Sequence, residues 1–131
     1  MTDLNSDGPH SPERTAEAGQ LFDDASRFLT YATMGGKGGL EYPAEVYRLV
    51  ADLYAATGRL PQMCSQLEDF LRDQEATGRL YEAQGRDIAA QLTRAAMHLG
   101  HAADAARALT RALQSVQADI AGLGVKDGPG D

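Results

Sequence analysis

Hydrophobic residues recur at alternating steps of three and four along the last third of the chain, from Arg86 to Leu123. This spacing places them on one side of an α-helix, whereas a half-buried strand would alternate strictly between apolar and polar residues. Other helices must cover a stripe of this kind, so the pattern predicts an all-α domain. The stripe consists of Leu92, Ala95, Leu99, Ala102, Ala106, Leu109, Leu113, Val116, Ile120 and Leu123.

Gly100 interrupts this stripe and leaves two interpretations open. A single helix over 86–123 would be about 60 Å long, and it would need a second subunit to cover it. Alternatively, Gly100 ends one helix as its C′ residue, and a second helix folds back from His101 or Ala102. We favour the folded-back hairpin, because the other segments of the chain are too short to cover the full rod.

Helix start and stop signals divide the rest of the chain. Ser11 and Pro12 read as an N-cap and a first helical residue, ahead of an amphipathic segment that stops at Gly35. The pentapeptide Ala-Thr-Gly-Arg-Leu occurs at 56–60 and again at 76–80. In each copy the glycine can adopt the left-handed conformation that closes a helix. The signals therefore predict helices joined by short turns.

These elements predict an antiparallel bundle of four or five helices in a single domain over 11–123. A disordered arm is expected at 1–10 and a disordered tail at 124–131, because both are rich in glycine, proline and polar residues. The helices are expected near 11–34, 43–57, 61–77, 81–99 and 101–123.

The charge of the chain bears on its partners rather than on its fold. Nineteen acidic residues against twelve basic ones give a net charge of −7. Phosphate backbones and anionic membrane surfaces repel such a chain. We therefore expect protein partners, and no direct contact with nucleic acid or membranes.

The sequence also favours a cytoplasmic location. Met1 to Pro9 lacks the basic start and apolar run of a signal peptide, and no apolar run is long enough to span a bilayer. Cys64 is the only cysteine, so no intramolecular disulfide can form and a reducing compartment fits.

Three groups of residues could carry chemistry, and each has a simpler structural interpretation. The run Gly35–Gly39 contains Lys37, but no strand precedes it and Gly38 stands where a phosphate loop requires Ser or Thr. It is expected to be a flexible connector. Cys64 occupies an apolar helix position, where a buried small hydrophobe is the usual role.

His98, His101 and Asp104 could share a helix face, but a structural metal site usually needs four ligands and Gly100 interrupts the helix. Other acidic residues are scattered over predicted solvent faces. We therefore expect no catalytic, cofactor-binding or metal-binding residues and no small-molecule substrate, which means that the chain is not an enzyme.

Large apolar and aromatic residues remain as candidates for an interaction surface. Core packing is expected for most of the five tyrosines, while several exposed on one surface would mark an interface. The long apolar stripe favours self-association, with a homodimer as the first expectation. The predicted interaction residues are Tyr47, Tyr54, Leu92, Leu99, Leu113 and Ile120.

Two resemblances accompany this pattern. The first is to the helical hairpin of tetratricopeptide-type repeats, and it implies hairpin geometry and a protein-binding role. Its first copy comprises Tyr47, Val50, Ala51, Tyr54, Gly58, Leu60, Met63, Leu67 and Phe70, and its second copy comprises Leu92, Ala96, Gly100, Ala102, Ala105, Leu109 and Ala112.

The second resemblance is to small uncharacterised all-helical proteins of high-GC actinobacteria, and it implies no activity. It is carried by the segments Gly38-Gly39-Leu40-Glu41-Tyr42-Pro43 and Leu60-Pro61-Gln62, by Gln66-Leu67 and by the alanine-rich last third.

A DNA-reading helix-turn-helix does not fit the segments 43–57 and 61–77. The second segment offers Arg72 as its one basic residue against Glu68, Asp69 and Asp73, whereas base and phosphate contacts require the opposite balance. The sequence therefore predicts a non-enzymatic protein–protein interaction or scaffold module. The alternative is an acidic accessory regulator in a DNA transaction, acting through a basic protein partner.

Overall fold

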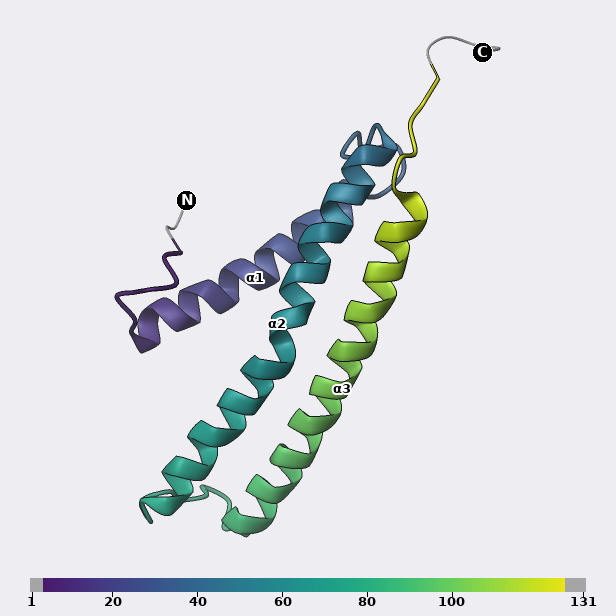
Figure 1. The fold of residues 1–131 in the computed structure, drawn as a ribbon. Helices are drawn as coiled ribbons and strands as arrows, with labels where there is room; N and C mark the ends of the chain where they lie inside the picture. Colours follow the sequence, from purple (N-terminus) through teal and green to yellow (C-terminus); the bar gives the residue numbers. More distant parts are fainter. Residues whose placement is uncertain (1–3, 127–131) are drawn as a thin grey trace. The chain divides into compact units, whose positions relative to one another are not determined.

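The structure is a computed structural model that describes residues 4–126. It consists of three helices, α1 (Pro12–Ala32), α2 (Pro43–Ala76) and α3 (Ile88–Ile120) (Figure 1). Within residues 4–126 no strand occurs. The predicted all-α class is confirmed, while three helices stand where four or five were expected.

The chain divides into two compact units, one that ends at Tyr42 and contains α1, and one that begins at Pro43 and contains α2 and α3. The sequence instead predicted one helical domain over 11–123. Of the predicted disordered arm and tail, residues 1–3 and 127–131 lie outside the described part of the chain, while residues 4–10 and 124–126 form no helix.

Helix α1 begins as its sequence predicts. The side chain of Ser11 accepts a hydrogen bond of 3.1 Å from the backbone N–H of Arg14, which would otherwise lack a partner in the first turn, and Pro12 is the first helical residue. The helix ends at Ala32, two residues before the expected end, and Thr33 caps it by donating to the carbonyl of Leu29 at 3.0 Å.

The loop after α1, which was expected to be a flexible connector, folds back against the end of the helix. Gly36 and Gly38 have φ angles of 82° and 81°, which an L side chain rarely adopts. A Cβ added at Gly39 would overlap the carbonyl group of Ala32, with 2.7 Å to its carbon. The backbone can fold against the end of α1 only because this position has no side chain.

Helices α2 and α3 lie side by side and run in opposite directions (Figure 1). One small hollow is shared by Tyr47 near the start of α2 and Ile120 at the end of α3. Halfway along the pair, the hydroxyl of Thr110 donates a hydrogen bond of 2.8 Å to the hydroxyl oxygen of Thr57. These contacts fix an antiparallel register in which Thr57 stands opposite Thr110.

The predicted break between 57 and 61 is wrong, because α2 runs without interruption through Gly58 and Pro61. An interior proline costs about 3 kcal/mol and an interior glycine about 1 kcal/mol. The residues on both sides of this point pack on α3: Val50 and Thr57 are buried, and Cys64 is half-buried. Packing along a helix of 34 residues outweighs these local costs.

The favoured hairpin at Gly100 is also wrong, since α3 is one helix of 33 residues. Both errors have one cause. If α2 ended near Thr57, no segment could cover a long α3; with α2 continuous, the two helices match in length and cover each other. The segments that carry the tetratricopeptide-like pattern, 47–70 and 92–112, therefore each lie within one helix.

The second glycine pentapeptide does end a helix. Gly78 has a φ of 70°, and α2 stops at Ala76. Residues 81–87 form a turn rather than the expected first turn of a helix, and α3 begins at Ile88 behind the N-cap Asp87.

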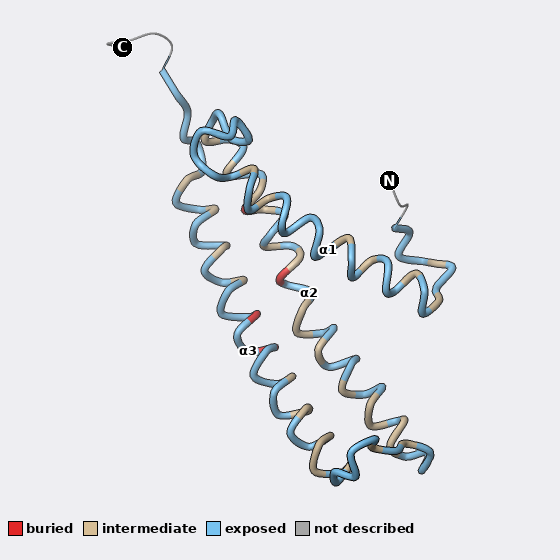
Figure 2. The backbone as a smooth tube through the Cα atoms, turned by 180° about the vertical axis from the view of Figure 1, so that it is seen from behind, coloured by how far each residue is buried: buried red, intermediate tan, exposed pale blue. Residues whose placement is uncertain are grey.

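The pair of helices has a thin core. Among residues 4–126 the buried apolar side chains are those of Val50, Ala103 and Ala106, all at the contact between α2 and α3, and most other positions are half-buried or exposed (Figure 2). Because each of these two helices contacts only the other within residues 43–126, the surfaces on both sides of the α2–α3 contact stay uncovered in this unit.

Candidate interaction surface

The inward-facing residues of α2 and α3 define the two open sides of the helix pair. They are the buried or half-buried positions that recur every three or four residues on each helix. On α2 they are Val50, Tyr54, Thr57, Pro61, Cys64, Glu68 and Leu71, and on α3 they are Leu92, Ala95, Leu99, Ala103, Ala106, Thr110, Leu113, Gln117 and Ile120.

A step of one residue along an α-helix turns the side chain by about 100°. The two helices face each other and run in opposite directions. The residue one position before an inward residue therefore points to the same open side on both helices. The residue one position after an inward residue points to the other open side on both helices. The two sides can therefore be compared directly from the sequence and the register.

One side is apolar along its middle. We call it the apolar open face, and its two rows precede the inward positions on α2 and α3. Leu67 is 52% exposed and Leu109 is 48% exposed, although both are large aliphatic side chains. The face consists of Leu49, Leu53, Ala56, Leu60, Met63, Leu67 and Phe70 on α2, and of Ala102, Ala105, Leu109, Ala112 and Val116 on α3; toward its ends the α3 row continues with the polar residues Gln91, Arg94, His98 and Asp119.

The other side is polar. A hollow of about 250 Å³ lies there between the helices. Ser65, Gly100 and Arg107, each of which follows an inward residue, line it together, which confirms that a forward step on either helix points to one side. Arg107 forms an ion pair of 2.9 Å with Asp104 at its rim. Water can solvate this side, whereas the apolar open face presents charge only at its two ends, where Arg94 and Asp119 lie.

The sequence-predicted interaction residues lie mostly between the helices. Leu92, Leu99, Leu113 and Ile120 are half-buried and face α2, and Tyr54 is half-buried on α2. Tyr47 is exposed beside Ile120 at the end of the pair. Whether they also take part in an interaction stays a prediction.

The predicted stripe on α3 splits into two parts. The stripe residues on the inward list face α2, while Ala102, Leu109 and Val116 are exposed; those that face α2 are Leu92, Ala95, Leu99, Ala106, Leu113 and Ile120. The apolar stripe in the sequence is wider than one neighbouring helix can cover, and this width indicates that part of it stays exposed. The matching row on α2, above all Met63 and Leu67, was missed because α2 was divided at Gly58.

The tyrosines are not core residues, contrary to expectation. Tyr31, Tyr42, Tyr47 and Tyr81 are exposed, and Tyr54 alone among them is half-buried. They are spread over α1, α2 and the loops, so they do not form one patch within either unit.

Few of the side chains that could carry chemistry lie close to one another. The rings of His98 and His101 lie on one continuous helix with centroids 6.3 Å apart, and both residues are exposed. In the described part of the chain, no three His, Cys, Asp or Glu side chains lie close enough to hold a metal ion. Cys64 is half-buried in the wall of the polar hollow.

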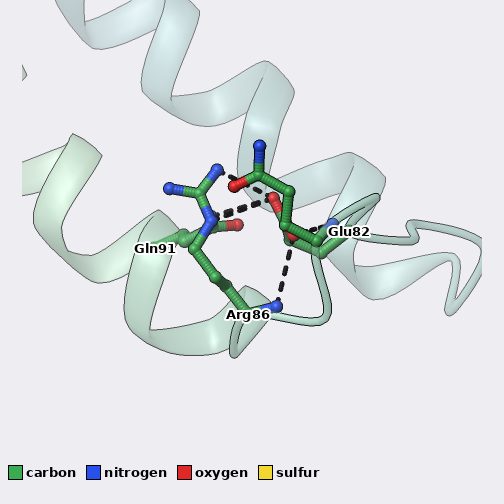
Figure 3. Close-up of polar contacts among 4 residues, drawn as sticks. Glu82, Arg86 and Gln91 are labelled. Atoms are coloured by element: carbon green, nitrogen blue, oxygen red, sulfur yellow. Dashed lines mark hydrogen bonds and ion pairs between the residues drawn. The ribbon is translucent and has the colours of Figure 1, made fainter.

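The strongest polar cluster organises the turn before α3 (Figure 3). Glu82 accepts hydrogen bonds from the guanidinium of Arg86 at 2.9 and 3.2 Å and from the side-chain amide of Gln91 at 3.2 Å. The backbone N–H groups of Gln84 and Arg86 also donate to it. The bonds from Arg86, then that from Gln91, lower the pKa of Glu82 from 4.5 to about 2. All partners are local, so the cluster shapes the turn and offers no free group to a ligand.

None of the helices in residues 4–126 combines the length and the apolar character that crossing a bilayer requires. No protein-family model matches the chain, and no curated protein or solved structure is significantly similar to it. The apolar open face of the α2–α3 pair is therefore the candidate functional site that the geometry supports best.

Proposed function

We propose that this chain is a non-enzymatic protein-interaction module and that the apolar open face binds its protein partner. The observation that supports this most directly is the contrast between the two open sides of one helix pair. Contiguous exposed apolar surface marks interaction sites, because leaving it in water is costly.

The two apolar rows and the net charge of the chain favour a helical protein partner. The face presents two neighbouring rows of apolar side chains, with leucines and a methionine on α2 beside alanines, Leu109 and Val116 on α3. An amphipathic helix can lay its apolar side along two such rows. The chain's net charge of −7 disfavours nucleic acid and anionic lipid as ligands. We infer a reducing compartment such as the cytoplasm, because Cys64 can form no intramolecular disulfide.

Affinity purification with matched variants tests this function. The tagged chain, a Leu67→Lys/Leu109→Lys variant and a Gln62→Lys/Gln114→Lys control would each be purified from the native host, and bound proteins would be quantified by mass spectrometry. Both variants add two positive charges, the first on the apolar open face and the second on the polar side. Circular dichroism would establish that each retains its helices.

The face variant should lose the partners that the unaltered chain and the control retain. Equal recovery of the same proteins with all three chains would contradict the proposed function.

A further inference from the structure

We propose that the partner on the apolar open face is a second copy of this chain, so that two α2–α3 pairs form an antiparallel four-helix bundle. In this arrangement α2 lies against α2 of the second copy, and α3 lies against α3 of the second copy. The inference rests on the proposed function, because it requires that this face is a binding surface, and it names the occupant.

The length of the face fits a second helix pair. From Leu49 to Phe70 the face extends over about 32 Å of helix. The apolar face of α1, from Leu21 to Ala32, extends over about 17 Å and would cover roughly half of it. Another α2–α3 pair has the matching length by construction.

The positions of the face are self-complementary. On α2 they are arranged nearly symmetrically about Leu60: Leu49 and Phe70 are about equally far from it, as are Ala56 and Met63. On α3, Ala105 and Leu109 are symmetric about Arg107, as are Ala102 and Ala112, while the position that matches Val116 is His98. In the register that Thr57 and Thr110 set, Leu60 stands opposite Arg107. One two-fold axis through this level, perpendicular to the helices, therefore serves both rows, as an isologous dimer requires.

This axis also places Leu109 against a small side chain and brings alanines together. Leu109 of one copy lies at the level of Ala105 of the second copy, and Ala102 lies at the level of Ala112 of the second copy. Alanines in these places let the two α3 helices approach closely, and alternation of large and small residues fills the space between them.

Charge at the ends of the face supports the same axis. Arg94 and Asp119 are exposed, and each precedes an inward residue of α3, so both point to the apolar side. They lie thirteen and twelve positions from Arg107 along α3. The axis therefore brings Arg94 of each copy beside Asp119 of the second copy, at two places. Within one helix the two residues are about 38 Å apart and cannot form a pair.

Sedimentation equilibrium of the full chain tests the assembly. The expected mass is about twice 14.0 kDa. Arg94→Asp or Asp119→Arg would each place like charges together twice and should raise the dimer dissociation constant about tenfold. The combined Arg94→Asp/Asp119→Arg variant should return to within about threefold of the unaltered chain, because each new pair again has opposite charges. Both sites are exposed, so the circular dichroism of these variants should match that of the unaltered chain.

Cross-linking tests the orientation. With Cys64→Ser removing the natural thiol, Leu60→Cys places a thiol beside the two-fold axis, and a short bis-maleimide should link two copies. Gln62→Cys in the same background lies on the polar side and should give no linked dimer. A dimer that fails both the cross-link at residue 60 and the charge-swap recovery would overturn the proposed arrangement.

A monomer at every concentration would overturn the inference outright. If Leu67→Lys/Leu109→Lys still removes partners in the affinity purification, the proposed function stands with a different partner. If that variant removes none, the function and the inference fail together.

Discussion

Glu82 shows how one side chain can organise a turn through its charge. The unfolded chain binds a proton at Glu82 near pH 4.5, whereas in the folded chain the pKa is about 2. Because the folded-state pKa is depressed, the stabilising effect of Glu82 is complete above about pH 4.5 and is lost as the pH falls toward about 2.

Glu82→Gln is therefore expected to lower the free energy of unfolding at pH 7 and to flatten its decline between about pH 5 and pH 2. Urea unfolding at a series of pH values measures both effects. Asp69→Asn, at an exposed position of α2, should leave the decline as in the unaltered chain. An identical pH profile for Glu82→Gln and the unaltered chain would show that the cluster does not form.

Gly39 supports a second prediction at this scale. Gly39→Ala should destabilise the turn after α1 by about 1–3 kcal/mol, because the added methyl group overlaps the Ala32 carbonyl. Gly35→Ala is the matched control, since nothing lies within 4 Å of a Cβ there. Limited proteolysis should cut the 33–42 loop faster in the first variant alone, and equal rates would contradict the folded turn.

At the scale of the element, local signals predicted some helix ends and failed at others. At Ser11 and Gly78 no packing against another helix favours a longer helix. The N-cap and the left-handed glycine therefore determine where the helix starts or ends. Gly58, Pro61 and Gly100 stand where two long helices cover each other. At these positions the local cost of glycine or proline, a few kcal/mol, is smaller than the stabilisation gained when both helices pack along their full length. The sequence pattern does not show which helices pack against each other.

Alanine substitution tests the continuity of both helices. Gly100→Ala meets nothing within 4 Å, and a Cβ at Gly58 meets only the Cγ2 of Thr110 at 3.8 Å. Each change should raise the free energy of unfolding by up to about 1 kcal/mol, because alanine is the better helix former. Gly78→Ala should lower it, since that residue has a φ of 70°. Destabilisation by Gly100→Ala would restore the hairpin interpretation.

The candidate site was only half predictable for a related reason. The apolar stripe on α3 is visible in the sequence, including Leu109 and Val116. Which part of it α2 covers depends on the register that Thr57 and Thr110 set, and no local pattern fixes that register. The row on α2 with Met63 and Leu67 becomes recognisable only once α2 is continuous and antiparallel to α3.

At the scale of the whole molecule, the α2–α3 pair explains why long helices can persist with so few buried side chains. Val50, Ala103 and Ala106 supply little apolar burial for two helices of 34 and 33 residues. Covering the apolar open face would add two further rows of contacts. The polar side, with Asp104 and Arg107, would stay in water and keep the assembly from growing beyond two copies.

The rate of thiol labelling at Leu67→Cys, in a Cys64→Ser background, measures most directly whether the apolar open face is covered in solution. Gln62→Cys on the polar side is the reference. The rate at residue 67 should fall as protein concentration rises through the dimer dissociation constant, while the rate at residue 62 stays constant. Equal, concentration-independent rates at both positions would show that the apolar open face is not covered in solution.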